Sequence, residues 1–228
     1  MIDSVFLDLD DTIFDFHKAE AIALEDTLRE MGITPNQILT ARYSEINLAQ
    51  WKRLELGIAT REEILTDRFK IFFEEIGADV DARKARQTYE DKLGCGHYFI
   101  DGAEELLDNL KGKYRLFLAS NGTAAVQVRR IASSGIEKYF DAIFISQTVG
   151  YDKPSKEYFD KCFASIPNFS KKNAIIIGDS ISSDIKGGIN AGIKTCLFNP
   201  KHRKNETDVK PDFEIFSLSE IPTLLSNL

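Results

Sequence analysis

Short apolar runs alternate with helical patterns over the second half of the chain, which is typical of a parallel β-sheet covered by helices. A first run begins at Val5, and four later runs are predicted to form strands: Arg115–Ala119, Ala142–Ile145, Ala174–Ile177 and Thr195–Phe198. The residues after Pro211 add a predicted edge strand and a final helix near Leu224. The alternation predicts an α/β fold whose core is a Rossmann-like, doubly wound parallel sheet.

A long helical block separates the first predicted strand from the second. Its apolar spacing predicts four helices, of which the second is opened by Pro35, the third begins with a capping box of Thr60 and Glu63, and the fourth covers Asp81–Leu93. A crossover between parallel strands needs only one helix. We therefore expect residues 15–97 to form an inserted α-helical domain, and residues 1–14 and 98–228 to form the core domain.

The composition is that of an ordinary globular chain, with 43% hydrophobic and 29% charged residues among 228. The net charge of −7 disfavours a general affinity for nucleic acid or an anionic membrane. No apolar run is long enough to cross a bilayer, and no signal peptide is expected before the first predicted strand. The three cysteines are odd in number and far apart in sequence, so they are predicted to be reduced thiols. These features predict a cytoplasmic protein with no nucleic-acid or membrane partner. They leave the oligomeric state open, and the basic run Lys201–Lys204 is predicted to be a solvated loop.

Polar side chains follow the ends of four predicted strands. They are Asp8 and Asp10, Ser120 and Asn121, Lys153, and Asp179 with Asp184. Because the carboxyl ends of parallel strands meet at one edge of the sheet, we expect these groups to converge. Several carboxylates suit Mg²⁺, and a hydroxyl with an ammonium group suits phosphate oxygens. Taken singly, each motif has a plainer explanation: an acidic turn, a Ser-Asn-Gly turn or a solvated lysine.

Taken together, the four motifs resemble those of the haloacid dehalogenase-like hydrolases. The matching segments are Asp8-Leu9-Asp10-Asp11-Thr12, Ser120-Asn121-Gly122, Lys153-Pro154, and Gly178-Asp179 through Asp184, in the order of that family. The inserted helical block looks like the C1-type cap of the family. The resemblance covers the whole chain and implies a Mg²⁺-dependent enzyme that hydrolyses a small phosphorylated metabolite.

The resemblance also implies a role for each residue. Asp8 would attack the phosphorus to give an aspartyl-phosphate, and Asp10 would act as general acid and then as general base. Mg²⁺ would be held by the Asp8 carboxylate, the Asp10 backbone carbonyl and Asp179. The remaining members support this centre: Ser120, Asn121 and Lys153 would bind the phosphate, Asp184 would orient a metal-bound water or Lys153, and Thr12 would lie behind the metal ligands.

The substrate is predicted from a narrower resemblance. The aromatic-Asp-Phe ending of Asp8–Phe16, the pair Ile46-Asn47 and Trp51, and the segment Thr60–Glu63 look like the pyrimidine 5′-nucleotidase branch. Phe14, Phe16 and Trp51 are the candidate specificity residues, although Trp51 is more readily explained as part of the cap core. A sugar-phosphate phosphatase and a phosphoglucomutase-like phosphoryl transferase are the alternatives, and a non-enzymatic phosphate- or Mg²⁺-binding protein is the competing class. Asp10 disfavours a dehalogenase, which has no leaving alkoxide to protonate.

Overall fold

The computed structural model describes all 228 residues and contains one six-stranded sheet in which every strand is parallel to its neighbours. The order across the sheet is β3-β2-β1-β4-β5-β6. The strands are β1 (Ser4–Leu7), β2 (Arg115–Ser120), β3 (Ala142–Ile145), β4 (Ala174–Gly178), β5 (Lys194–Phe198) and β6 (Phe213–Ile215). The chain builds outward from β1 to β3 on one side and then from β4 to β6 on the other, so the topological switch point lies between β1 and β4.

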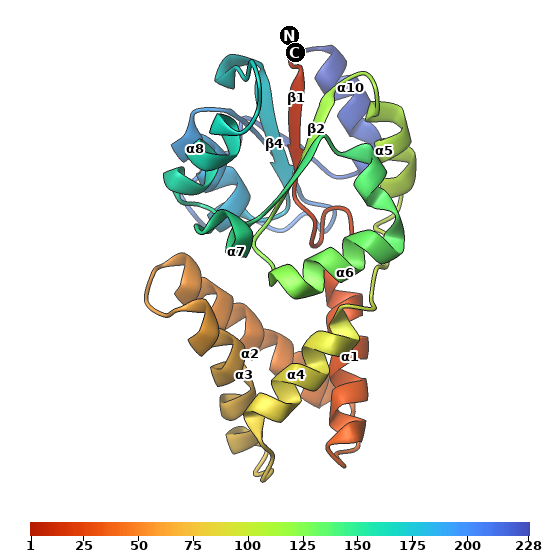
Figure 1. The fold of residues 1–228 in the computed structure, drawn as a ribbon, viewed down its shortest axis with the longest axis vertical. Helices are drawn as coiled ribbons and strands as arrows, with labels where there is room; N and C mark the ends of the chain where they lie inside the picture. Colours follow the sequence, from red (N-terminus) through yellow and green to blue (C-terminus); the bar gives the residue numbers. More distant parts are fainter. The chain divides into compact units, whose positions relative to one another are not determined.

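Helices cover both faces of this sheet (Figure 1). They are α5 (Ala103–Leu110), α6 (Ala124–Ser134), α7 (Ser146–Val149), α8 (Lys156–Ala164), α9 (Lys186–Ala191) and α10 (Ile221–Ser226), with short helical turns at Ile136–Tyr139, Lys171–Asn173, Ile181–Ile185 and Leu218–Glu220. Val5 and Leu7 belong to the core cluster that includes α5 and α10, whereas Phe6 belongs to the cluster that includes α8. Because all three side chains are fully buried, each contributes about 1.5–3 kcal/mol of transfer free energy.

The helical block consists of α1 (Phe16–Glu30), α2 (Gln37–Glu55), α3 (Arg61–Glu75) and α4 (Ala82–Leu93). Its centre is aromatic: the ring centroid of Tyr43 lies 5.1 Å from that of Phe69 and 5.5 Å from those of Phe72 and Tyr89. The predicted capping box of Thr60 and Glu63 is confirmed at the start of α3. The prediction that Pro35 opens α2 was wrong. Asn36 caps this helix instead, because its side chain accepts a hydrogen bond from the backbone N–H of Leu39.

The chain divides into two compact units. One combines Met1–Asp15 with Tyr98–Leu228 and holds the sheet, and the other is the helical unit Phe16–His97. Asp15 joins the sheet unit through a hydrogen bond from its N–H to the carbonyl of Tyr98, 2.8 Å long. None of the helices is both long and apolar enough to span a bilayer. The basic run Lys201–Lys204 is exposed along its whole length.

Candidate active site

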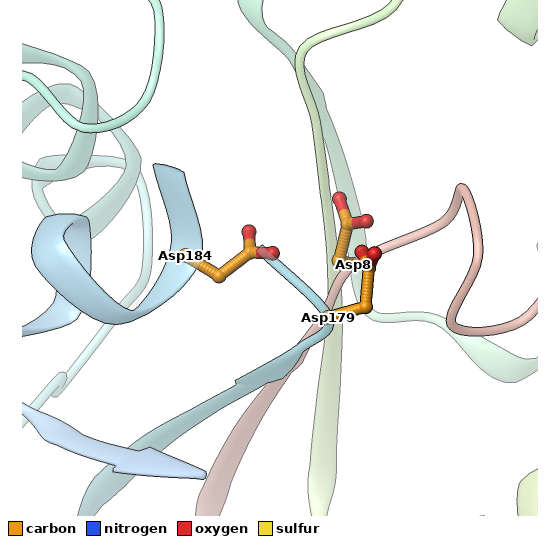
Figure 2. A group of neighbouring side chains, drawn as sticks. All are labelled: Asp8, Asp179 and Asp184. Atoms are coloured by element: carbon orange, nitrogen blue, oxygen red, sulfur yellow. The ribbon is translucent and has the colours of Figure 1, made fainter. Parts of the chain in front are cut away.

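The carboxylates that follow β1 and β4 meet at the switch point of the sheet. Asp8 comes directly after β1, and its backbone N–H donates a 3.0 Å hydrogen bond to the carbonyl of Ile177 on β4. Asp179 comes directly after β4, and Asp184 lies on the helical turn Ile181–Ile185. Each of these three carboxylates offers an oxygen within 4.8 Å of the other two, and Figure 2 shows them turned toward a common space. The sheet topology therefore brings together residues that are more than 170 positions apart in sequence.

Lys153 is buried at the centre of this group. Its ammonium donates three hydrogen bonds of 2.6 Å each, to Asp8 Oδ1, to Asp184 Oδ1 and to the carbonyl of Ala119. A lysine has three N–H donors, so all of them are used on protein oxygens. In this arrangement Lys153 has no N–H left for the phosphate contact that the sequence predicts. Such a contact requires that one of the three hydrogen bonds be broken. In this structure Lys153 instead places a positive charge beside the Asp8 carboxylate.

The electrostatics of the cluster are dominated by burial and by a surplus of carboxylates. Burial, with help from the carboxylates of Asp184 and Asp10, raises the pKa of Asp8 to about 8 despite the opposing effect of Lys153. Burial also raises the pKa of Asp179 well above its usual range, and the charge of Asp8 adds to this. Burial acts to lower the pKa of Lys153, but Asp184 and Asp8 outweigh it and hold the pKa above its ordinary value. Lys153 is therefore a permanent cation, but its single charge does not offset the burial and mutual repulsion of Asp8 and Asp179.

The oxygens that remain available fit a divalent cation. Asp184 uses Oδ1 on Lys153 and Oδ2 on the backbone N–H of Ser180, at 3.1 Å, so it positions its neighbours and is a poor metal ligand. Asp8 uses only Oδ1, and the half-buried carboxylate of Asp179 has no hydrogen bond or ion pair. The backbone carbonyl of Asp10 accepts no backbone hydrogen bond. One or two carboxylates with a carbonyl form the kind of partial oxygen shell that Mg²⁺ takes in proteins.

Ser120 and Asn121 follow β2 and have different partners. Ser120 Oγ accepts hydrogen bonds from the N–H of Gly122 at 3.1 Å and from Gln127 Nε2 at 2.9 Å, which leaves its own hydroxyl proton to donate to a phosphate oxygen. The Asn121 side chain joins the backbone of Lys153 twice, through its Nδ2 and its Oδ1, each at 2.8 Å. The Asn121 side chain thus holds Lys153 in place, and phosphate binding by Asn121 stays a prediction.

The carboxylate of Asp10 contacts two side chains of α6 that the sequence analysis did not identify as candidates. Arg130 Nη1 on α6 lies 2.5 Å from Asp10 Oδ1, and Gln127 Nε2 lies 2.6 Å from Asp10 Oδ2. Both helix residues are buried. The sequence does contain a signal that could have identified them. Gln127 and Arg130 are three positions apart, so they lie on one face of the helix, and the other buried residues of α6 are apolar.

Two glycines in the motifs are explained by close approach of a site residue. A Cβ on Gly178 would lie 2.3 Å from Asp184 Oδ2, and a Cβ on Gly122 would lie 2.2 Å from Gln127 Nε2. Real Cβ atoms do not come this near to other heavy atoms. Glycine at these positions therefore leaves room for the side chains that hold Lys153, Asp10 and Ser120.

The remaining candidates are placed as follows. Thr12 is fully buried, and its hydroxyl has no hydrogen-bond partner. Phe14 is fully buried in the core of the sheet unit, 5.2 Å from the ring of Phe99, so the prediction that Phe14 is a specificity residue is corrected. Phe16 and Trp51 are half-buried residues of the helical unit. Trp51 packs at the edge of a small apolar cluster, with the Arg61 guanidinium 5.3 Å from its ring centroid, which agrees with a role in the core of that unit.

Comparison with known proteins identifies the family to which this chain belongs. The family model described as "Haloacid dehalogenase-like hydrolase" matches residues 5–198, well over half of the chain. The chain belongs to this family. The predicted family and fold class are thereby confirmed.

Individual relatives match over nearly the whole chain. The HAD-hydrolase YfnB of Bacillus subtilis has a crystal structure described as bound to magnesium; it is 38% identical, covers 98% of each chain and gives a TM-score of 0.94. The pyrimidine 5′-nucleotidase PynA of Streptococcus pneumoniae is 37% identical over 95% of this chain and 92% of its own length. The pyrimidine 5′-nucleotidase YjjG of Escherichia coli is 30% identical over 98% and 97%.

Proposed function

We propose that this hydrolase is a Mg²⁺-dependent phosphomonoesterase that acts through an aspartyl-phosphate, with a nucleoside 5′-monophosphate as its substrate. The observation that carries the proposal is the arrangement of Asp8. One of its oxygens is fixed by Lys153 at 2.6 Å, and its carboxylate has an oxygen within 4.8 Å of one on Asp179. A carboxylate that is held by a buried cation and turned toward a cation site is suited to attack an anionic phosphate.

The chain's own residues divide the chemistry of the first half-reaction. Asp8 forms a bond to phosphorus while the bond between phosphorus and the ester oxygen breaks. Asp10 delivers its carboxylic proton to that oxygen, so that the product leaves as an alcohol. The hydroxyl of Ser120 donates to an equatorial phosphate oxygen, and Lys153 balances the charge of Asp8. In the second half-reaction Asp10 takes a proton from a water molecule. The water oxygen forms a bond to phosphorus while the bond between phosphorus and Asp8 breaks, so that inorganic phosphate is released and Asp8 is regenerated.

Mg²⁺ would be held by the Asp8 and Asp179 carboxylates and by the Asp10 carbonyl, and when bound it offsets the negative charges of nucleophile and phosphate. Asp184 and Asn121 act on this centre through Lys153. Asp184 contacts its ammonium, and Asn121 fixes its backbone. These assignments leave every site carboxylate with a separate task.

The substrate class rests on the names of two relatives. Two relatives of nearly full length, at 37% and 30% identity, are named pyrimidine 5′-nucleotidases. Phe16 and Trp51 of the helical unit stay the candidate residues for selecting the substrate. A sugar phosphate is the alternative substrate.

A panel of phosphate monoesters tests the proposal. The purified protein is incubated with uridine, thymidine, cytidine and adenosine 5′-monophosphates, with several sugar phosphates and with p-nitrophenyl phosphate, and released phosphate is measured with Mg²⁺ and again after chelation. We expect Mg²⁺-dependent release, fastest from the pyrimidine nucleotides. Rapid hydrolysis of sugar phosphates with slow hydrolysis of all nucleotides would refute the substrate class, and equal activity after chelation would refute the metal dependence.

A further inference from the structure

We propose that Gln127 and Arg130 of α6 are positioning residues that hold the carboxylate of Asp10 in the orientation needed for proton transfer. The inference rests on the proposed function, because it concerns the acid and base of that reaction. It begins with an asymmetry in the site: the carboxylate of Asp8 is held by Lys153, whereas that of Asp10 is held entirely from α6.

Both oxygens of the Asp10 carboxylate are fixed by different residues. Arg130 Nη1 contacts Oδ1 at 2.5 Å, and Gln127 Nε2 donates to Oδ2 at 2.6 Å. The two helix residues are also joined to each other, because Arg130 Nη1 donates to Gln127 Oε1 at 2.9 Å. A carboxylate held at both oxygens by a linked pair of side chains has little rotational freedom. Each oxygen keeps a second lone pair, so the transferred proton is carried there, at a fixed position relative to the ester oxygen.

Arg130 is itself fixed by its surroundings. Its side chain is fully buried, and its guanidinium carbon lies 5.2 Å from the ring centroid of Phe14. Phe14 belongs to the turn after Asp10, in which the N–H of Asp11 donates to the carbonyl of Phe14 at 2.6 Å. The ring thus supports the guanidinium from the same turn that carries Asp10, and a cation over an aromatic face is favourable. This contact explains a buried aromatic residue at position 14 without a substrate.

Gln127 links Asp10 to the phosphate-binding hydroxyl. Its Nε2 lies 2.6 Å from Asp10 Oδ2 and 2.9 Å from Ser120 Oγ, so one amide group spans the two. The bare backbone of Gly122 makes room for this amide, since a Cβ there would lie 2.2 Å from Nε2. The Ser-Asn-Gly turn and the acid–base residue are therefore oriented by the same side chain.

The test compares esters that differ in their need for a proton. A nucleoside 5′-monophosphate releases an alkoxide that must be protonated, whereas p-nitrophenyl phosphate releases a stabilised phenolate that leaves without a proton. The value of kcat/KM covers the steps up to the first irreversible one, here formation of the aspartyl-phosphate, so the later use of Asp10 as a base does not enter. Uridine 5′-monophosphate and glycerol 2-phosphate serve as alkyl esters, and Asp10→Asn gives the loss expected when the acid is absent.

We expect Arg130→Met to lower kcat/KM about 100-fold for the alkyl esters and less than about threefold for p-nitrophenyl phosphate. Gln127→Leu removes the contacts to both Asp10 and Ser120, so it should lower the alkyl-ester values about tenfold and the p-nitrophenyl phosphate value by a smaller factor, since only the alkyl esters need the proton. In an Asp10→Asn background, Arg130→Met should cause less than about a threefold further loss, because its effect acts through Asp10. Arg129→Met is the matched control, since Arg129 is exposed one position away and the charge change is identical.

The outcomes separate this inference from the proposed function. Equal losses for alkyl and aryl esters in both single variants, or a rise in alkyl-ester hydrolysis, would overturn the positioning role while the phosphatase assignment stands. No hydrolysis of any ester by the wild-type protein would overturn the proposed function and this inference with it. Thermal unfolding of each variant is recorded alongside, and Gln127→Leu and Arg130→Lys decide the question if Arg130→Met does not fold.

Discussion

The two units of the molecule each bury a cluster of charged side chains, and the clusters differ in their balance of charge. The active-site cluster is defined as Asp8, Asp10, Asp179 and Asp184 with Lys153 and Arg130. The helical-unit cluster is defined as Glu20 and Glu90 with Arg68, Arg86 and Asn47. The first has four carboxylates and two cations, and the second has two of each.

The helical-unit cluster is complete without any ligand. Asn47 Nδ2 donates to Glu20 Oε1 at 2.7 Å, and Arg68 Nη1 donates to Asn47 Oδ1 at 3.0 Å. Arg68 also lies 3.8 Å from Glu90, which accepts a 3.0 Å hydrogen bond from Arg86. Each charged group has an opposite charge or a hydrogen bond beside it, as buried polar groups require. We interpret this cluster as a structural part of the helical unit.

The active-site cluster has a surplus of negative charge that the protein does not neutralise. The Asp179 carboxylate has no partner in the chain, and the pKa values of Asp8 and Asp179 are raised chiefly by burial. Keeping such groups near one another lowers stability unless a proton or a cation is bound. The comparison shows that burial of charge does not by itself mark a functional site; the uncompensated part of the charge does.

The largest expected effect separates the clusters by activity. Asp8→Asn removes the proposed nucleophile and should lower phosphate release by about 10⁴-fold or more. Glu20→Gln makes the same kind of change in the helical-unit cluster and should alter p-nitrophenyl phosphate hydrolysis by less than about threefold. Steady-state phosphate release with Mg²⁺ present measures both. An Asp8→Asn protein with unchanged activity would remove the chemical distinction between the two clusters.

The second effect separates them by stability. Arg68→Met leaves Glu20 and Glu90 with less positive charge in a buried setting, so the free energy of unfolding should fall by about 3 kcal/mol. Urea unfolding followed by the fluorescence of Trp51, the single tryptophan, reports on the helical unit. Arg42→Met is the control, because Arg42 pairs with Glu75 at 2.7 Å on the exposed surface and such pairs contribute little. Equal losses of unfolding free energy in the two variants would show that the buried cluster contributes no more to stability than an exposed ion pair.

The same contrast explains what the sequence could reveal. The parallel sheet, the inserted helices and the convergence of Asp8, Ser120, Lys153 and Asp179 follow from strand ends that share one edge. Local signals were also sufficient for the capping box of Thr60 and Glu63, because that pattern depends on residues three apart. These features are either periodic or local, and a sequence displays both kinds.

Contacts between distant side chains could not be predicted in this way. Nothing in the sequence pairs Asp10 with Arg130, which is 120 positions away, or turns the Asn121 amide onto the backbone of Lys153. Phe14 was a candidate specificity residue because of the resemblance carried by Asp8–Phe16, yet its ring is fully buried. The direction of a side chain at a turn depends on packing against other elements. The sequence could therefore identify these residues as candidates but could not identify the groups that they contact.

The third effect concerns the metal. Wild-type protein should be stabilised by about 2.7 kcal/mol when Mg²⁺ is present at 100 times its dissociation constant. Asp179→Asn should lose most of this gain, and without metal it should be at least as stable as the wild type, because one of the clustered carboxylates is gone. Thermal unfolding with Mg²⁺ and with a chelator measures both. Asp208→Asn is the exposed control with the same charge change, and an equal loss of Mg²⁺ stabilisation there would argue against a local site.

The last effect, the smallest per pH unit, is a pH dependence that the metal removes. In metal-free protein the pKa of Asp8 is raised to about 8, so between about pH 4 and pH 8 the folded state binds a proton that the unfolded state has lost. The free energy of unfolding therefore falls as pH rises, by at most about 1.4 kcal/mol per pH unit for each such proton. With saturating Mg²⁺ the slope should disappear over this pH range, because the cation keeps the carboxylates ionised in the folded state, as they already are in the unfolded state. Urea unfolding at several pH values, with Asp8→Asn as the variant that lacks this contribution, measures the slope. A free energy that does not vary with pH in metal-free protein would mean that Lys153 alone compensates Asp8, and the active-site cluster would then be as self-sufficient as that of the helical unit.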